Sequence, residues 1–326
     1  MRSRAAVEFS EFRESAMFKE NTVFVLGAGA SVPYEFPTAK MLTTAICDRV
    51  LATGYLTDVQ IHTGISPEIY VEMARELRIS RAPSIDLWLG DREEYIQAGK
   101  ICIAREIIEK ENLMRLEGLN EPERWYADLF HTYLRPHRSG GYKAFPQNSV
   151  YFITFNYDRS LEQALLLLLQ HNYGLNEPAA ADLVNQVNIL HVYGQLGRLP
   201  WQPKDRAKTE RPYKSVADWG LAKEHSTDIK VLSEADSASD IFRTAQKWLG
   251  RADKICFLGF GYHPENLARL RPEQITANVS GSCFHLDLRW KEYLERNDNN
   301  PFGKRIIMGD WTEDALGYLK ARVRPE

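Results

Sequence analysis

Two glycine-rich turns in the sequence could bring backbone N–H groups close to a phosphate. The first turn, GAGAS, contains Gly27, Ala28, Gly29 and Ser31, and the second, GFGYHPEN, contains Gly259 and Gly261. Glycine lets the backbone approach a pyrophosphate at the start of a helix, where the helix dipole favours negative charge. A dinucleotide would fit such turns, and Ser31 could donate to a phosphate. A tight strand-to-helix connection explains the first turn as well, because Val32 stands where the dinucleotide fingerprint has its third glycine.

Polar side chains that could perform chemistry follow two further apolar runs. The segment TFNYD places Asn156 and Asp158 directly after one run, and His191 ends another. Asp158 could equally be the N-cap of the next helix and Asn156 a turn residue. A lone histidine near a strand end is more often structural than catalytic. These residues gain interest from their shared position after predicted strands.

The elements that position these residues alternate between strand and helix patterns. Six apolar runs predict strands at Thr22–Leu26, Val150–Thr154, Val187–Val192, Lys254–Leu258, Cys283–Leu288 and Arg305–Met308. Helical patterns cover Arg159–Gln170, Ser237–Leu249, Pro264–Leu270, Trp290–Arg296 and Trp311–Ala321. This alternation predicts an α/β fold, a Rossmann-like doubly wound and mainly parallel sheet of about six strands. The carboxyl ends of parallel strands share one edge of the sheet. The two glycine turns, the TFNYD segment and the segment after His191 should therefore line that edge.

Two segments interrupt the alternation. Residues 38–140 are rich in helical periodicity and contain no convincing strand, so we expect an inserted helical subdomain within a Rossmann-like domain of residues 1–37 and 141–326. Residues 194–236 are polar and weakly periodic, which is typical of a long loop or a short helical lid.

Composition excludes several classes of protein. With 326 residues the chain can bury a large core, and a net charge of −3 provides no overall positive field to attract nucleic acid. The four cysteines form no CxxC pair, so neither a zinc site nor a disulfide framework is expected. The charged start MRSRAAVEFSEFRE does not resemble a secretory signal, and no apolar run is long enough to cross a bilayer, so we expect a cytoplasmic protein.

The order of the motifs resembles the sirtuin-like superfamily. Its members show GAGxS, a T-x-N-Y/I-D segment, a His-x-x-Gly or His-Gly segment and a late glycine turn, and here these are GAGAS, TFNYD, HVYG and GFGYHPEN. The stretches Ser84–Leu89 and Gly99–Ala104 also look like the helical insertion of bacterial sirtuin-like NADases from phage-defence systems. The resemblance covers residues 22–319. Classical sirtuin deacylases carry zinc-binding cysteine pairs after the catalytic histidine, whereas this chain has no cysteine between Cys102 and Cys256.

The resemblance implies roles for individual residues. Asn156 would hold the attacking water or the ribose hydroxyls, Asp158 would bind the nicotinamide carboxamide, and His191 would engage the ribose hydroxyls as hydrogen-bond partner or base. Thr154 and the glycine turns would belong to the cofactor-binding residues. Asp287, near the end of the predicted strand CFHLDL, is a candidate for the adenosine ribose, although a solvated strand-end residue explains it nearly as well.

The resemblance therefore implies an NAD⁺ hydrolase that releases ADP-ribose and nicotinamide, with NAD as substrate, no metal, and a role in anti-phage defence through NAD depletion. A non-catalytic subunit that senses NAD or ADP-ribose is the alternative, and a deacylase is a weaker one. Because unregulated NAD hydrolysis is toxic, we expect activation by homo-oligomer assembly or by a partner such as a HerA-type ATPase or an Argonaute-like protein. Neither a membrane nor direct nucleic-acid binding is expected.

Overall fold

The core of the protein is one parallel sheet whose strand order reverses at its centre. The computed structural model describes residues 20–117, 124–134, 141–296, 300–304 and 306–323, so the chain start lies outside the described residues. Its six strands are all parallel and lie in the order β3-β2-β1-β4-β5-β6. This is the order of the doubly wound Rossmann fold, in which a crevice opens between the two central strands. The predicted fold class is confirmed.

Five of the six predicted strands form at or near their expected places. The strands are β1 (Thr22–Leu26), β2 (Val150–Thr154), β3 (Asn188–His191), β4 (Lys254–Leu258), β5 (Asn278–Gly281) and β6 (Ile307–Met308). Every residue of β1 is buried, as expected for a central parallel strand covered on both faces. Arg305, the first residue of the last predicted strand, lies outside the described residues.

The predicted strand Cys283–Leu288 was wrong. The strand of this region is β5, which ends at Gly281, and the chain then turns into the helix α14 (Leu288–Arg296). His285, in the middle of the predicted run, has a left-handed φ of 54°, which is incompatible with an extended strand.

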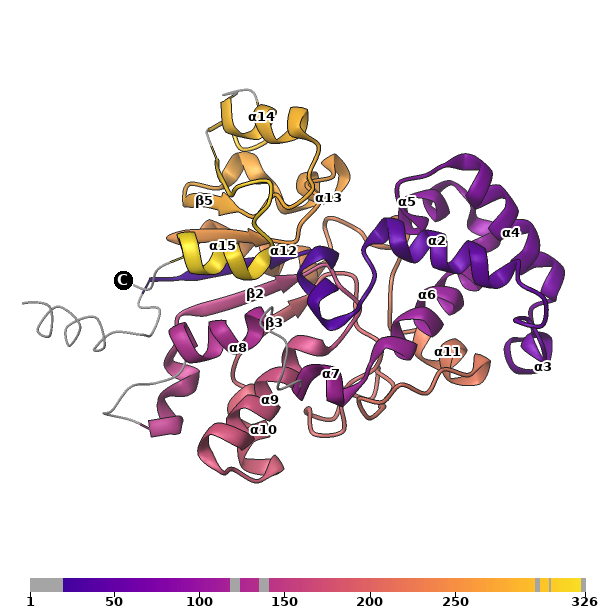
Figure 1. Cartoon of the computed structure of the whole chain (residues 1–326), viewed down its shortest axis with the longest axis horizontal. Coiled ribbons are helices and arrows are strands. Elements are labelled where there is room, and N and C mark those ends of the chain that lie inside the picture. The colour runs from indigo at the N-terminus through magenta and orange to yellow at the C-terminus, as the bar shows by residue number, and fades with distance from the viewer. Residues whose placement is uncertain (1–19, 118–123, 135–140, 297–299, 305, 324–326) are drawn as a thin grey trace, which may run out of the picture.

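Helices cover both faces of the sheet (Figure 1). On one side, α8 (Trp125–Leu129) packs against α9 (Ser160–Tyr173) and α15 (Ala315–Arg322), and α10 (Glu177–Val184) lies against α9. On the other side, α12 (Asp240–Gly250) packs against α13 (Pro264–Leu270). The helices predicted from periodicity therefore form, with ends shifted by a few residues.

A group of helices lies beyond the carboxyl ends of the strands (Figure 1). These are α2 (Ala39–Val50), α3 (Val59–Thr63), α4 (Pro67–Ser80), α5 (Ile85–Trp88), α6 (Ile96–Lys110) and α11 (Trp219–Ser226), followed by the short α7 (Leu113–Glu117). The helix α11 comes from the second interruption of the alternation, yet it packs along α6. Residues 194–236 therefore lead the chain back to this helical group, where α11 packs along α6. The division into two domains stays a prediction.

Local sequence signals fix where the site-forming helices begin. The hydroxyl of Thr38 accepts from the N–H of Met41 at the start of α2, and the hydroxyl of Ser84 accepts from the N–H of Leu87 at the start of α5. Across the part of the chain that the structure describes, no helix is long and apolar enough to cross a membrane.

Candidate functional site

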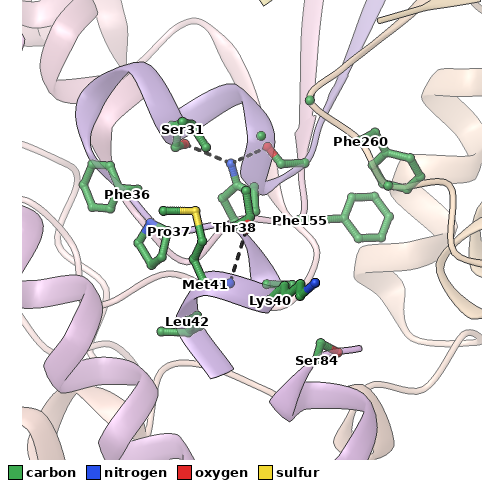
Figure 2. A pocket seen from close by; sticks show the side chains of 18 of the residues that line it. Ser31, Phe36, Pro37, Thr38, Lys40, Met41, Leu42, Ser84, Phe155 and Phe260 are labelled. Carbon is green, nitrogen blue, oxygen red and sulfur yellow. Dashed lines mark hydrogen bonds between the residues drawn. The ribbon is translucent and has the colours of Figure 1, made fainter. Parts of the chain in front are cut away.

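A large pocket opens at the point where the strand order reverses. Its volume is about 970 Å³, and it lies between the turns after β1, β2 and β4 and the beginnings of α2 and α5. Figure 2 shows Phe155 and Phe260 on one side of this pocket and Phe36, Pro37 and Met41 on the other. A pocket of this size at this topological position is where doubly wound folds bind nucleotides and other ligands.

The two glycine turns are packed directly against each other. The N–H of Gly29 donates to the carbonyl of Gly259 at 2.9 Å, and a Cβ on Gly27 would lie 2.6 Å from that same oxygen. Gly259 has a left-handed φ of 57°, and a Cβ there would lie 1.9 Å from the nitrogen of Ala30. Close packing of the two turns therefore requires glycine at these positions, independently of any ligand.

Asn156 is held at the pocket by two hydrogen bonds from its amide nitrogen. Nδ2 donates to the carbonyl of Gly27 and to the hydroxyl of Ser31, each at 3.0 Å. A carbonyl can only accept, so the Gly27 contact fixes which side of the amide carries the nitrogen. Oδ1 accepts no hydrogen bond from the described residues, and Asn156 lines the pocket. This oxygen is therefore available to a water or a hydroxyl of a bound molecule.

Asp158 follows Asn156 by two residues, and both of its carboxyl oxygens accept hydrogen bonds. Oδ2 accepts from the hydroxyl of Ser31 at 2.9 Å, and Oδ1 accepts from the N–H of Ser160 at 3.0 Å and from its hydroxyl. Burial raises the pKa of Asp158, and the hydrogen bonds from Ser160 and Ser31 oppose that rise. The carboxyl group therefore orients Ser31 and, through it, Asn156.

His191 points away from the pocket and into a buried pair with Glu162. Its Nδ1 lies 2.9 Å from the backbone carbonyl of Asn156, and its Nε2 lies 2.7 Å from Oε1 of Glu162. Both partners are acceptors, so the ring must carry a proton on each nitrogen to satisfy them. Burial lowers the pKa of His191, but the charge and hydrogen bond of Glu162 outweigh it, and the net direction is upward. A doubly protonated ring cannot act as a base in this arrangement.

The pocket brings together most of the residues predicted for the site. Those that line it are Gly27, Ala28, Gly29, Ser31, Asn156, Asp158, Gly259 and Gly261. Thr154, His191 and Asp287 do not line it. Thr154 accepts from the N–H of Asn156 at the end of β2, and Asp287 is exposed beside Arg289, with which it forms an ion pair of 3.0 Å. The roles predicted for all of these residues stay predictions.

Known proteins resemble this chain in structure at low sequence identity. No family model matches it, and no curated protein does. The chain is similar to solved Sir2 homologues. A serine-to-alanine variant in complex with ADP-ribose is 12% identical with a TM-score of 0.35, and the alignment covers 93% of this chain and 91% of that one. A triple variant in complex with 2'-O-acetyl ADP-ribose is 14% identical with a TM-score of 0.36, covering 98% and 93%.

A third similar structure is a histidine-to-asparagine variant of a Sir2 homologue in complex with ADP-ribose. It is 12% identical with a TM-score of 0.35, and it covers 93% of this chain and 91% of that one. At this level of similarity, what this chain does has to be inferred from its own residues.

Several polar residues that line the pocket were missed by sequence reasoning. Oδ1 of Asp86, in the first turn of α5, lies 2.6 Å from the hydroxyl oxygen of Tyr157. The hydroxyl of Tyr193 donates to Oδ1 of Asn266 at 2.7 Å, and all four residues line the pocket. An acidic residue in the first turn of a helix is ordinarily explained by the helix dipole, so the sequence pattern alone does not single out Asp86.

Metal-ligating side chains do not cluster in the described part of the chain. No group of three His, Cys, Asp or Glu residues lies there in an arrangement that could hold an ion. The four cysteines are free and buried. Burial raises the pKa of the Cys283 thiol, which follows the pocket-lining Ser282 in the chain, to about 11. A buried thiol with a raised pKa is a poor nucleophile.

Proposed function

We propose that this protein hydrolyses NAD⁺ to ADP-ribose and nicotinamide. The observation that carries the proposal is the fixed amide of Asn156, which lines a pocket of about 970 Å³ at the strand-order reversal and whose Oδ1 accepts no hydrogen bond from the described residues. The choice of NAD⁺ as substrate rests on the motif resemblance, because the GAGAS and TFNYD turns that form this arrangement resemble those of sirtuin-like proteins. The proposal joins a geometry found in this chain to a substrate suggested by its sequence.

The chemistry of NAD⁺ suits a site of this kind. The bond to be broken joins a ribose carbon to a positively charged pyridinium, so nicotinamide departs as a neutral ring and needs no acid. The barrier lies in the oxocarbenium-like ribose, which fixed dipoles can stabilise. Oδ1 of Asn156 presents the negative end of the amide dipole to the pocket. The same oxygen can accept a hydrogen bond from a water and hold that water for attack on the ribose carbon.

We assign supporting roles to the buried residues around Asn156. Asp158 positions Asn156 through Ser31, and His191 holds its backbone carbonyl. Neither group needs to touch the substrate for this role. The binding of nicotinamide by Asp158 and of ribose by His191, which the resemblance implies, would require both side chains to leave their present partners.

The position of His191 also favours a second candidate function. A ring that is doubly hydrogen-bonded and turned from the pocket is expected in a module that binds NAD or ADP-ribose without cleaving it, or in an enzyme held latent. In the latent case, assembly or a partner would release His191 toward the pocket. This fits the role in anti-phage defence by NAD depletion that the resemblance suggests.

Nicotinamide release from purified protein tests the two functions. We expect the wild-type chain to release nicotinamide from NAD⁺, alone or in its assembled form, and Asn156→Ala to bind NAD⁺ without releasing it. Asn185→Ala removes an exposed amide at the end of α10 and serves as the matched control, with activity unchanged. Binding of NAD⁺ by the wild-type protein with no release in any assembly state would establish the sensing module instead.

Assembly is tested on the same samples. Light scattering gives the mass of the protein with and without a candidate partner, while nicotinamide release is followed in parallel. We expect release to rise with assembly. Full activity of a lone monomer would contradict the latent state and leave hydrolysis itself standing.

A further inference from the structure

Asp86 is a carboxyl group of the pocket wall for which the proposed mechanism has so far no use. It lies in α5, outside the sheet, and contacts the site through the hydroxyl of Tyr157, the residue that follows Asn156. Among the described residues it forms no ion pair with Lys, Arg or His. A carboxyl group in a pocket wall without a neighbouring cation is costly to ionise.

The hydrogen bonds around Tyr157 indicate the protonation state of Asp86. The Tyr157 hydroxyl lies 2.6 Å from Oδ1 of Asp86 and 2.9 Å from the backbone carbonyl of Lys230. The hydroxyl has one hydrogen, and an ionised carboxylate and a carbonyl are both acceptors only. An ionised Asp86 would therefore leave one of these short oxygen contacts without a hydrogen. A protonated Asp86 donates to Tyr157, which donates to Lys230, and both contacts are satisfied.

Charged groups on the elements around Asp86 form no ion pair with it among the described residues. Glu234 forms an ion pair of 2.9 Å with Lys100, and Arg269 donates to backbone carbonyls of the segment before α12. Lys40, at the start of α2, and Glu265, on α13, line the same pocket, and neither forms an ion pair with Asp86 among the described residues. Burial raises the pKa of Asp86, and its hydrogen bond with Tyr157 only partly opposes that rise. The direction of this shift agrees with the hydrogen-bond count.

We propose that Asp86 is a second catalytic residue of this site, a carboxylic acid in the empty pocket that becomes the proton acceptor for the attacking water. This inference rests on the proposed NAD⁺ hydrolysis. A positively charged pyridinium bound beside Asp86 favours its ionised form, so the proton leaves to solvent when NAD⁺ binds. The bond between the ribose carbon and the pyridinium nitrogen then breaks, and the electron pair leaves with neutral nicotinamide.

The remaining step restores the acid. Water held by Asn156 forms a bond to the ribose carbon, and its proton passes to the carboxylate of Asp86. Over the cycle one water is consumed and one proton is released, which balances the hydrolysis of NAD⁺. His191 cannot take this proton while it is paired with Glu162 and the Asn156 carbonyl. Asp86 lines the pocket and, once ionised, can take this proton.

Infrared difference spectroscopy and pH-dependent kinetics on the full chain test the inference. We expect the wild-type protein at neutral pH to show the C=O stretch of a protonated carboxylic acid, which Asp86→Asn abolishes and Tyr157→Phe shifts. We expect Asp86→Asn to slow nicotinamide release by roughly 100-fold, as loss of a general base does. The rise of kcat/KM with pH that deprotonation of Asp86 produces should vanish in that variant.

Asp182→Asn, an exposed carboxyl on α10, is the control and should change neither measurement. An unchanged carboxylic-acid band in Asp86→Asn, with nicotinamide release intact, would overturn the inference and leave the hydrolase proposal standing. If the wild-type protein shows the carboxylic-acid band but releases no nicotinamide in any assembly state, the hydrolase proposal is overturned. The role of Asp86 as a base is then overturned with it. A retained pH dependence in an active Asp86→Asn would also overturn the base role.

Discussion

Substitution of Gly259 by alanine adds two costs in unfolding free energy. One comes from the left-handed backbone conformation, and the other comes from the clash of the added Cβ with the first glycine turn. The residue has a left-handed φ of 57°, and an added Cβ would lie 1.9 Å from the backbone nitrogen of Ala30. The left-handed conformation costs an alanine about 1–2 kcal/mol. Gly174, the C-cap of α9, has a φ of 65° but no atom within 4 Å of an added Cβ. Gly174→Ala therefore carries the conformational cost alone and is the matched control.

The difference between the two variants measures how tightly the turns pack. Overpacking of a buried contact costs about 1–3 kcal/mol, so Gly259→Ala should lose that much more unfolding free energy than Gly174→Ala. Urea denaturation with a constant m-value gives both losses. Because the displaced turns line the pocket, Gly259→Ala should also weaken ADP-ribose binding, while Gly174→Ala should not. Equal losses of stability in the two variants would refute the close packing of the turns.

Three further predictions concern buried charges near the site. Glu111→Gln should cost about 3–5 kcal/mol of unfolding free energy in denaturation, because it leaves Arg159 and Arg211 buried without the carboxylate they share; the exposed Glu177→Gln should change nothing. The pKa of His191 is raised and that of Glu162 is lowered. Their ion pair therefore stabilises the fold fully only between about pH 4.5 and 6.5. This stabilisation is lost as pH rises through the folded-state pKa of His191 and as pH falls through the folded-state pKa of Glu162. Melting temperatures across pH should show this window in the wild type and not in Glu162→Gln. Asp158→Asn should cost about 1–3 kcal/mol and reduce nicotinamide release, because an amide nitrogen cannot accept from Ser31 or Ser160; unchanged release would show that Asn156 does not depend on this support.

The sheet was predictable where burial dictates composition. Central strands such as Thr22–Leu26 are covered on both faces and are therefore rich in apolar and β-branched residues. The strand β5, Asn278–Gly281, lacks this signal. Gly281 is required there because an added Cβ would lie 2.0 Å from the hydroxyl of Tyr262, and only the folded structure reveals that neighbour. Among the apolar residues after it, Cys283 is buried but Phe284 and Leu288 are exposed, so this apolar run does not mark a buried strand.

The site was predictable in its location but not in its hydrogen bonds. Topology places the ends of β1, β2 and β4 at one edge, so motifs at those ends meet whatever their separation in sequence. Which way a side chain points at a strand end depends on its partners. His191 turns toward Glu162 on α9, and no pattern in the sequence marks that glutamate as its partner. Asp86 reaches the pocket from the helical group for a similar reason, through Tyr157.

The glycine motifs and the polar residues therefore carry different weight for function. Gly27, Gly29 and Gly259 are required by the contact between the two turns, so their presence would be expected even in a protein that binds no dinucleotide. The amide of Asn156 has no comparable structural need for its oxygen, since its nitrogen alone makes the bonds that join the two sides of the turn. In a non-catalytic protein, Asn156→Ala would lose only these two hydrogen bonds. In an enzyme, the same substitution would also lose the bound water that attacks the substrate. Comparing stability with nicotinamide release in Asn156→Ala consequently distinguishes a structural amide from a catalytic one more sharply than any change in the glycines.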